Sequence, residues 1–383
     1  MKILAKFPQI SRAVPALLVL LLGSVAFAGP LLPPAGPITS TSKTLAEVEP
    51  RTAISAANTP GDADSVFKIS TPGSYYLMAN ISGVAGKHGI EIAASDVTID
   101  LNGFALIGTP GMGAFDGISV TLPAQSSIVI RGGSVRGWGD KGIDLFTNGP
   151  KNCRVENVVS SSNISTGISV GSGSAIIKCS AADNGVTGLS CGTGGLISDS
   201  TAYSNTTIGI STSTGCTISG CTVSSNETHG ILAQSQCTVI ASTATSNRGI
   251  GIVVGIGSSV LDCISGANFD SGISCNAYCI IRGNTASSNG PGGSDGAGIL
   301  ATGTNNRIEA NSCTGADRGI EVAVGGNFII KNSCAGNTID WVLAANNVYG
   351  PIIDRSSPAT PAVSGKSAAS TLGSTDPNAN FTY

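Results

Sequence analysis

Four titratable residues in the first part of the chain stand at related places in a recurring pattern. His88, Asp116 and Lys141 each come immediately before a Gly, and Asp144 comes two residues after the last of these glycines. A carboxylic acid can donate a proton while a nearby carboxylate, His or Lys accepts one, and cleavage of a sugar chain needs such a pair. We therefore take these four as candidate catalytic residues.

Four further residues flank this set and are candidate substrate-binding residues: Glu91, Arg136, Trp138 and Asp140. Glu91 and Asp144 occupy equivalent positions, whereas the other three lie in an adjoining loop. Arg136 and Lys141 could bind an acidic sugar, and the indole ring of Trp138 could stack on a sugar face. The competing interpretation is that these residues form an ordinary polar edge and that the aromatic side chains pack against an N-terminal cap.

The elements that must position these residues belong to a repeat. A Gly followed by Ile or Leu recurs at Gly89, Gly117, Gly142, Gly167, Gly188, Gly209, Gly230, Gly251, Gly272, Gly298 and Gly319. An Asn stands four residues upstream at Asn163, Asn184, Asn205, Asn226, Asn247, Asn268 and Asn289. Because Asn tolerates left-handed backbone conformations and bonds its local backbone, we expect it in a turn, where stacked copies can also bond to one another.

Aliphatic columns with strand periodicity accompany the Gly column. Apolar residues stand one and three positions after each Gly, a second aliphatic column lies eight residues before the Asn, and small residues lie three before it. Such a repeat buries its apolar face only when copies stack. It predicts an all-β, single-stranded parallel β-helix solenoid of about 11 rungs of about 21 residues. A leucine-rich repeat is disfavoured because Leu is scarce.

The ends of the chain differ from the repeat. Residues 1–28 have the basic start, apolar core and small-x-small site of a signal peptide, so we expect export, to a secreted or cell-surface location, and no membrane span after cleavage. Residues 29–65 are Pro-rich and predict an N-terminal cap, residues 66–349 carry the solenoid, and residues 350–383 form a low-complexity tail. The formal net charge of −3 disfavours nucleic acid as a partner.

The eleven cysteines are expected mostly to fill the core. Cys179, Cys221 and Cys263 occupy alternate rungs, too far apart to bond. Cys216 with Cys237, and Cys313 with Cys334, fall on adjacent rungs and could form disulfides. Because no C-x-x-C pair is present and the two histidines are far apart in sequence, we expect no zinc site and assign no metal ligands.

Residues 97–106 (VTIDLNGFAL) together with the repeating N-x-x-x-G-I/L pattern resemble the pectin-lyase-like superfamily of right-handed parallel β-helices, including exported bacterial repeat proteins with no assigned activity. The resemblance implies a right-handed coil. It implies little about activity, because the N-T-D, Asp-Asp, G-H-G and R-I-K motifs of polygalacturonases and the D-P-H-E motif of alginate epimerases are absent. A Ca²⁺ cofactor would be needed only by a lyase of this fold.

Two functions follow from this pattern. The outward column in the middle of the repeat is mostly Ser and aliphatic, which favours a non-catalytic exported protein with a surface, matrix or glycan-contact role and polysaccharide as its partner. The alternative is a polysaccharide lyase or glycoside hydrolase that uses the early polar residues. An open groove lined by His88, Asp116, Lys141 and Asp144 would favour the enzyme, and burial of these residues would disfavour it.

Overall fold

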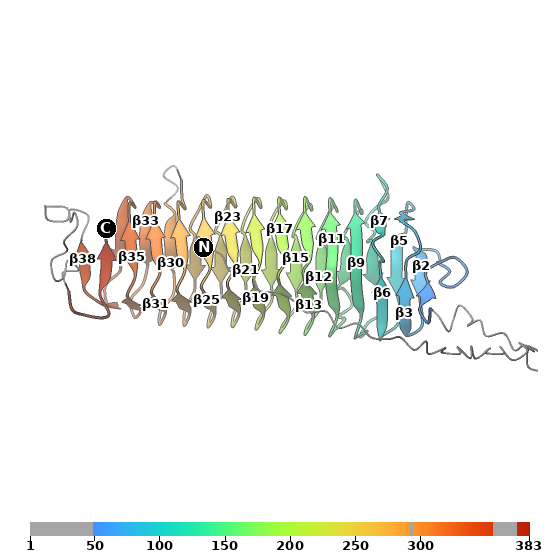
Figure 1. The fold of residues 1–383 in the computed structure, drawn as a ribbon, viewed down its shortest axis with the longest axis horizontal. Coiled ribbons are helices and arrows are strands. Elements are labelled where there is room, and N and C mark those ends of the chain that lie inside the picture. The colour runs from blue at the N-terminus through green and yellow to red at the C-terminus, as the bar shows by residue number, and fades with distance from the viewer. Residues whose placement is uncertain (1–48, 292–294, 355–373) are drawn as a thin grey trace, which may run out of the picture. The chain divides into compact units, whose positions relative to one another are not determined.

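A computed structural model describes residues 49–291, 295–354 and 374–383, which form stacked coils of parallel strands (Figure 1). A typical coil contributes one strand to a 13-stranded sheet, here sheet 1, and two strands to a 26-stranded sheet, here sheet 2. Strands of successive coils pair in register, so equivalent residues of the repeat become neighbours. The predicted signal peptide and most of the predicted cap lie outside the described residues.

Sheet 1 consists of β2 (Ser65–Ile69), β5 (His88–Ile92), β8 (Ile118–Val120), β10 (Ile143–Leu145), β12 (Ile168–Val170), β15 (Leu189–Cys191), β18 (Ile210–Thr212), β21 (Ile231–Ala233), β24 (Ile252–Val254), β27 (Ile273–Cys275), β30 (Ala297–Ala301), β33 (Arg318–Val322) and β36 (Ile339–Leu343).

Sheet 2 consists of β1 (Thr52–Ala53), β3 (Gly73–Tyr76), β4 (Ile81–Ser82), β6 (Val97–Asp100), β7 (Ala105–Ile107), β9 (Val129–Arg136), β11 (Arg154–Ser161), β13 (Ala175–Ile177), β14 (Ser180–Ala182), β16 (Leu196–Ser198), β17 (Thr201–Tyr203), β19 (Thr217–Ser219), β20 (Thr222–Ser224), β22 (Thr238–Ile240), β23 (Thr243–Thr245), β25 (Ser259–Leu261), β26 (Ile264–Gly266), β28 (Ile280–Arg282), β29 (Thr285–Ser287), β31 (Arg307–Glu309), β32 (Ser312–Thr314), β34 (Phe328–Ile330), β35 (Ser333–Ala335), β37 (Val348–Tyr349), β38 (Ile352–Asp354) and β39 (Asn380–Thr382).

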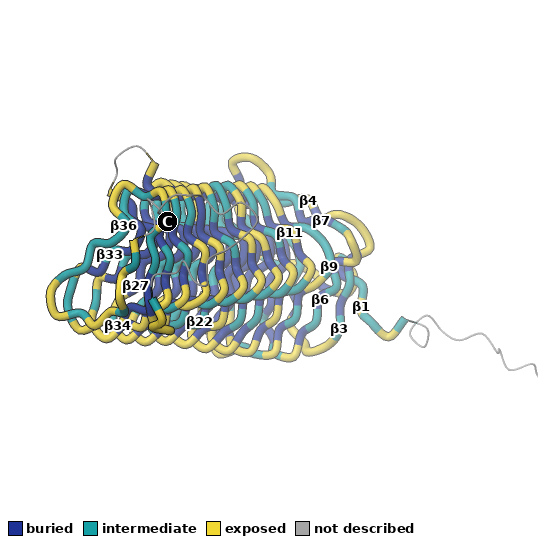
Figure 2. The backbone as a smooth tube through the Cα atoms, turned by 60° about the vertical axis from the view of Figure 1, so that its left-hand side comes forward, coloured by how far each residue is buried: buried dark blue, intermediate teal, exposed yellow. Residues whose placement is uncertain are grey.

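The predicted aliphatic columns form the core. Ile168 pairs with Leu189 on sheet 1, Ile176 pairs with Ile197 on sheet 2, and all four side chains are buried. Each such side chain stabilises the fold by about 1.5–3 kcal/mol relative to exposure. Figure 2 shows buried segments along the strands and exposed residues at the turns. Burial of one residue type per column therefore holds the coils in a single register.

The Gly column exists because two neighbours approach its Cα. A Cβ on Gly188 would lie 2.7 Å from Nδ2 of Asn205 and 2.7 Å from the carbonyl oxygen of Gly209 on the next coil. Real Cβ atoms do not come this close to other heavy atoms, so a larger residue would force the coils apart.

The Asn column is a ladder of side-chain hydrogen bonds between coils. Oδ1 of Asn205 accepts from the backbone N–H and from Nδ2 of Asn184, at 3.1 and 3.0 Å, and Nδ2 of Asn205 donates to Oδ1 of Asn226 at 3.0 Å. The expected left-handed turn position falls instead on the preceding residue, as at Ser204 (φ 55°). The Asn thus acts across coils more than within its own turn.

Two further columns of turn residues, which contain mixed residue types, also make hydrogen bonds between coils. In one of them the backbone N–H of Cys179 donates to Oγ of Ser200, that of Cys221 donates to Oγ of Ser242, and that of Cys263 donates to Oδ1 of Asn284. The alternation of Cys with Ser explains the cysteine spacing. All eleven cysteines are buried free thiols, including the Cys216–Cys237 and Cys313–Cys334 pairs.

The solenoid is longer than the predicted 11 rungs, since sheet 1 has 13 strands. The additional strands β2 and β36 lack the Gly-Ile pair: Phe67 aligns with Ile90, and Trp341 aligns with Ile320. Strand pairing also continues outside the predicted bounds of the solenoid, residues 66 and 349. Strand β1 pairs with β3, and β39 pairs with both β35 and β38.

The C-terminal tail prediction is wrong for residues 374–383. Asn380 is buried and continues one of the turn ladders, because its Oδ1 accepts from the backbone N–H of Asn332 at 3.0 Å. The chain end therefore completes the last coil. Within the described residues, no helix is long and apolar enough to cross a membrane.

Replacing Asn205 by Ala should destabilise the solenoid, because it leaves the backbone N–H and one side-chain amide N–H of Asn184 without their buried acceptor. Buried unsatisfied groups cost about 1–3 kcal/mol each, so we expect a loss of about 3 kcal/mol in the free energy of unfolding, measured by urea denaturation. The neighbouring exposed substitution Thr206→Ala is the control. Equal midpoints for the two variants would show that the ladder contributes little.

Candidate functional site

The predicted catalytic residues come together at the first rungs of sheet 1. Glu91, Ser119 and Asp144 are in-register neighbours on β5, β8 and β10 and face outward. His88, Asp116 and Lys141 stack beside them, because the N–H groups of the following glycines bond to the next coil, as from Gly89 to the Asp116 carbonyl at 3.0 Å. The repeat spacing thus predicted their juxtaposition correctly.

Burial shifts the pKa values of His88 and Asp116 toward the uncharged form of each group. Nδ1 of His88 accepts the backbone N–H of Asp116 at 2.9 Å, and burial lowers the pKa of the imidazole. Burial also raises the pKa of Asp116 from 3.8 to about 7, assisted by the charges of Asp144 and Asp140. The same His88 Nδ1 lies 3.5 Å from Oδ2 of Asp116. Asp116 is only 5% exposed, so substrate access to its carboxyl group is poor.

Lys141 and Asp144 are occupied by structural contacts. The Lys141 ammonium lies 2.7 Å from Oδ2 of Asp144 and 3.1 Å from Oγ1 of Thr147. Oδ1 of Asp144 accepts the N–H groups of Phe146 and Thr147, at 2.9 and 3.0 Å. Burial raises the pKa of Asp144, but the hydrogen bonds from Lys141 and Thr147 outweigh it, so the net shift is downward. This pair fixes the turn after β10 and is not poised to transfer protons.

Glu91 is almost fully buried as well. Its Oε1 accepts from the Thr121 hydroxyl and lies 2.7 Å from the Lys68 ammonium, whereas Oε2 is buried with no hydrogen-bond partner. Among the predicted substrate-binding residues it is therefore the one with a buried acceptor oxygen that has no partner in the described residues.

The prediction that Trp138 stacks on a sugar is wrong. Its side chain is 0% exposed, and Nε1 donates to the Leu106 carbonyl at 3.3 Å inside the core. Trp138 stands four residues before Gly142, which is the Asn position of the repeat, and its N–H donates to Oδ1 of Asn163. The position of Trp138 in the Asn column therefore indicated that this residue points inward.

Arg136 and Asp140 lie on opposite sides of this buried Trp. Arg136 is exposed at the end of β9, where it pairs with Ile107 and Ser161 of sheet 2, so it does not join the cluster on sheet 1. Asp140 is half-buried and close enough to raise the pKa of Asp116. The predicted binding set is thus divided between two faces.

A second candidate, which was not predicted from the sequence, is a shallow hollow on the outer face of sheet 1 in the middle of the helix. It spans β21, β24, β27 and the turn after β30, and its lining includes Leu232, Gln234, Val253, Ser274, Asn276 and Thr302. Gly255 stands between Gln234 and Asn276 in the same column and adds no side chain. The sequence signal was this column, four residues after the repeat Gly.

Comparison with known proteins identifies the fold. Residues 141–276 match the family model described as right handed beta helix region. The A-modules of the Azotobacter vinelandii mannuronan C-5 epimerases AlgE4 and AlgE6 have similar structures. For AlgE4 the TM-score is 0.57 at 16% identity, covering 78% of this chain and 88% of that one. For AlgE6 the TM-score is 0.56 at 14% identity, covering 81% and 90%.

The chain therefore has the right-handed parallel β-helix fold, as the resemblance implied. At these identities the similarity establishes the fold alone. A search of curated protein sequences gave no match.

The Asp116 carboxyl group should make stability fall as pH rises. Its pKa is about 7 in the folded chain and 3.8 ordinarily, so between these pH values the folded chain holds a proton that the unfolded chain has lost. The free energy of unfolding therefore falls as pH rises through this range, and the loss is complete above it. Asp116→Asn, which keeps an oxygen for the Lys141 N–H, should raise the free energy of unfolding on the order of 3 kcal/mol near pH ~8 and leave it unchanged near pH ~3.

Urea denaturation across this pH range measures the difference. The matched control is Asp183→Asn, an exposed carboxylate on a distant turn. If Asp116→Asn and the unmodified chain lose stability in parallel as pH rises, Asp116 is ionised in the folded protein.

Proposed function

We propose that this chain is an exported, non-catalytic β-helix protein that binds a polysaccharide along the outer face of sheet 1. The observation that carries the proposal is the hollow over β21, β24 and β27, which is lined by amide, hydroxyl and aliphatic side chains and the Cys275 thiol and, among the described residues, by no carboxylate, His, Lys or Arg. Amides and hydroxyls can hydrogen-bond to sugar hydroxyls, and aliphatic groups can cover the apolar face of a sugar ring.

The shape of this surface suits a chain-like ligand. Equivalent side chains recur on successive coils, about 4.8 Å apart, so the four coils extend over about 14 Å. Gln234 and Asn276 are exposed, with Gly255 leaving a gap between them, and Leu232 and Val253 are half-buried beside them. A polymer lying along the helix axis would meet aliphatic, hydroxyl and amide groups on successive coils.

The charges near the hollow point to a neutral polymer. The AlgE4 and AlgE6 A-modules belong to enzymes named for mannuronan, which favours a polysaccharide as the ligand class. An acidic polymer, however, needs cationic partners, and the lining of the hollow has none. The first rungs also offer a polyanion little free positive charge, because Lys68 is paired with Glu91 and Lys141 is paired with Asp144.

The second candidate function is a polysaccharide lyase or glycoside hydrolase, and Asp116 is the observation that favours it. A carboxyl group with a pKa of about 7 beside a neutral imidazole can exchange protons at neutral pH. Against it stand the burial of Asp116 and Asp144 and the engagement of Lys141. We therefore expect binding without turnover.

Binding to neutral polysaccharides on a glycan array, followed by titration of the strongest ligand, tests this proposal. The double substitution Gln234→Ala with Asn276→Ala should weaken binding about tenfold, since two neutral hydrogen bonds contribute about 1–3 kcal/mol. Gln236→Ala is the matched control, because this exposed amide is two residues from Gln234 and does not line the hollow. Equal loss in both variants, or no binding to any glycan, would refute the proposal.

A further inference from the structure

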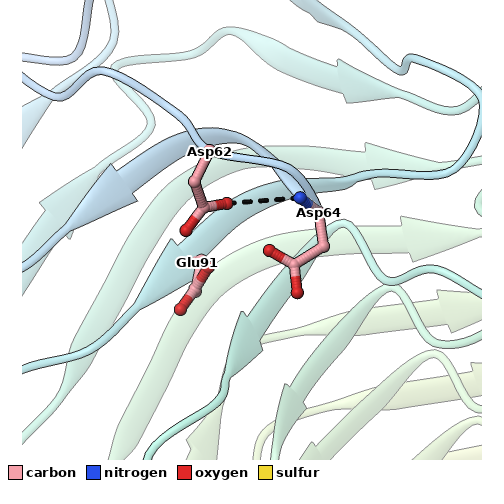
Figure 3. A group of neighbouring side chains, drawn as sticks. All are labelled: Asp62, Asp64 and Glu91. Atoms are coloured by element: carbon pink, nitrogen blue, oxygen red, sulfur yellow. Dashed lines mark hydrogen bonds between the residues drawn. The ribbon is translucent and has the colours of Figure 1, made fainter.

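Three carboxylates meet at the N-terminal end of the solenoid, apart from the groups discussed for catalysis. Asp62 and Asp64 lie in the loop that leads into β2, and Glu91 faces outward from β5, opposite Lys68 of β2. One carboxylate oxygen of each acid lies within 4.8 Å of one from each of the others. Figure 3 shows the three side chains close to one another, two from the loop and one from β5.

An unpartnered buried oxygen points to a missing ligand there. The Glu91 side chain is only 3% exposed, and its Oε2 is buried without a hydrogen-bond partner, although its Oε1 is bonded. Buried carboxylate oxygens are almost always paired, because desolvation of an unpaired one is costly. A water or a cation at this oxygen would remove the penalty, and the neighbouring carboxylates favour a cation.

The resident ammonium groups do not fully neutralise the three acids. Lys68 Nζ lies 2.8 Å from Oδ2 of Asp62 and 2.7 Å from Oε1 of Glu91. The Lys87 ammonium bonds to the backbone carbonyls of Asp62 and Ser65 instead of a carboxylate. The Asp64 carboxylate is exposed. One negative charge and the free Oε2 of Glu91 therefore remain for a ligand.

We propose that Asp62, Asp64 and Glu91 form a Ca²⁺ site that ties the entry loop to the second strand of sheet 1. All the donors are hard oxygens, and Ca²⁺ accepts irregular sets of six to eight oxygens at ~2.3–2.6 Å, so oxygens on opposite sides of the ion lie about 4.8 Å apart. Mg²⁺ requires a tighter octahedron, and Zn²⁺ prefers nitrogen or sulfur donors.

The site would act as a clamp on the first coil. Solenoid ends need capping because their terminal coil has a neighbour on one side only. Asp62 already holds the loop, since its Oδ1 accepts the Ser65 N–H and hydroxyl at 3.1 and 2.7 Å. The ion would add a bond from this loop to β5 and would displace Lys68 from Glu91. Lys68 is therefore a competitor of the ion.

Isothermal titration of the purified, EDTA-treated chain with CaCl₂, paired with its melting temperature, tests the site. We expect one bound Ca²⁺ per chain with a Kd of about 0.1–1 mM, as in extracellular modules, a higher melting temperature, and weaker binding of Mg²⁺. Asp64→Asn should weaken Ca²⁺ binding at least about tenfold. Lys68→Met should tighten it, because the competing ammonium is gone.

Asp183→Asn makes the same change of charge on a distant exposed turn and should leave Ca²⁺ binding unchanged. Absence of Ca²⁺ binding in both the unmodified chain and Lys68→Met would overturn the proposal. Equal affinity of Asp64→Asn and Asp183→Asn would also overturn it, because the ion would then bind elsewhere. Neither result depends on glycan binding, so the proposed function is tested separately.

Discussion

Hydrogen bonds from turn side chains to the next coil are the constraint on which the rest of the structure depends. A flat stack of short parallel strands can slip, because each three-residue strand offers few backbone bonds to define its register. The Asn ladder removes this freedom, since each Oδ1 accepts both the N–H and the amide of the equivalent Asn one coil before, as Asn226 does from Asn205. Once the register is fixed, Ile meets Ile in the core and the Gly column can hold the backbones close.

The same constraint explains where polar chemistry can and cannot collect. In the regular middle, the inward columns are needed for the core and the turn columns are needed for the ladder. The outward positions alone are free to vary, and on sheet 1 they carry hydroxyl, amide and aliphatic groups. Between residue 49 and Asn163 this Asn ladder is absent, and Trp138 fills the interior instead. Charged residues are tolerated there because they pair with one another, as Lys141 does with Asp144.

The sequence was sufficient for the parts of the fold that repeat one residue type. Gly, Asn and Ile each recur in one column, so the all-β solenoid and the stacking of His88, Asp116 and Lys141 could be predicted. The other turn columns could not, because Ser200, Ser242 and Asn284 perform one role with two residue types and alternate with cysteines. The last coil was missed for a related reason: Asn380 is 48 residues from its ladder partner Asn332.

The candidate site was predicted only in position. Spacing placed the acids on neighbouring coils, but burial and hydrogen bonding, which determine whether Asp116 and Asp144 can react, are properties of the packed structure. Trp138 was assigned to the surface from its residue type, although its column indicated the core. The hollow around Gln234 and Asn276 was not predicted, because amide side chains are not candidate catalytic groups.

Our central claim is that this β-helix binds a glycan in the middle of sheet 1 and leaves it chemically unchanged. A crystal structure of the protein with a bound oligosaccharide tests this most directly. The account predicts an intact oligosaccharide along the outer face of β21, β24 and β27, in contact with Gln234 and Asn276. An oligosaccharide bound over His88 and Asp116, or one whose linkages or ring configuration have changed, would contradict it.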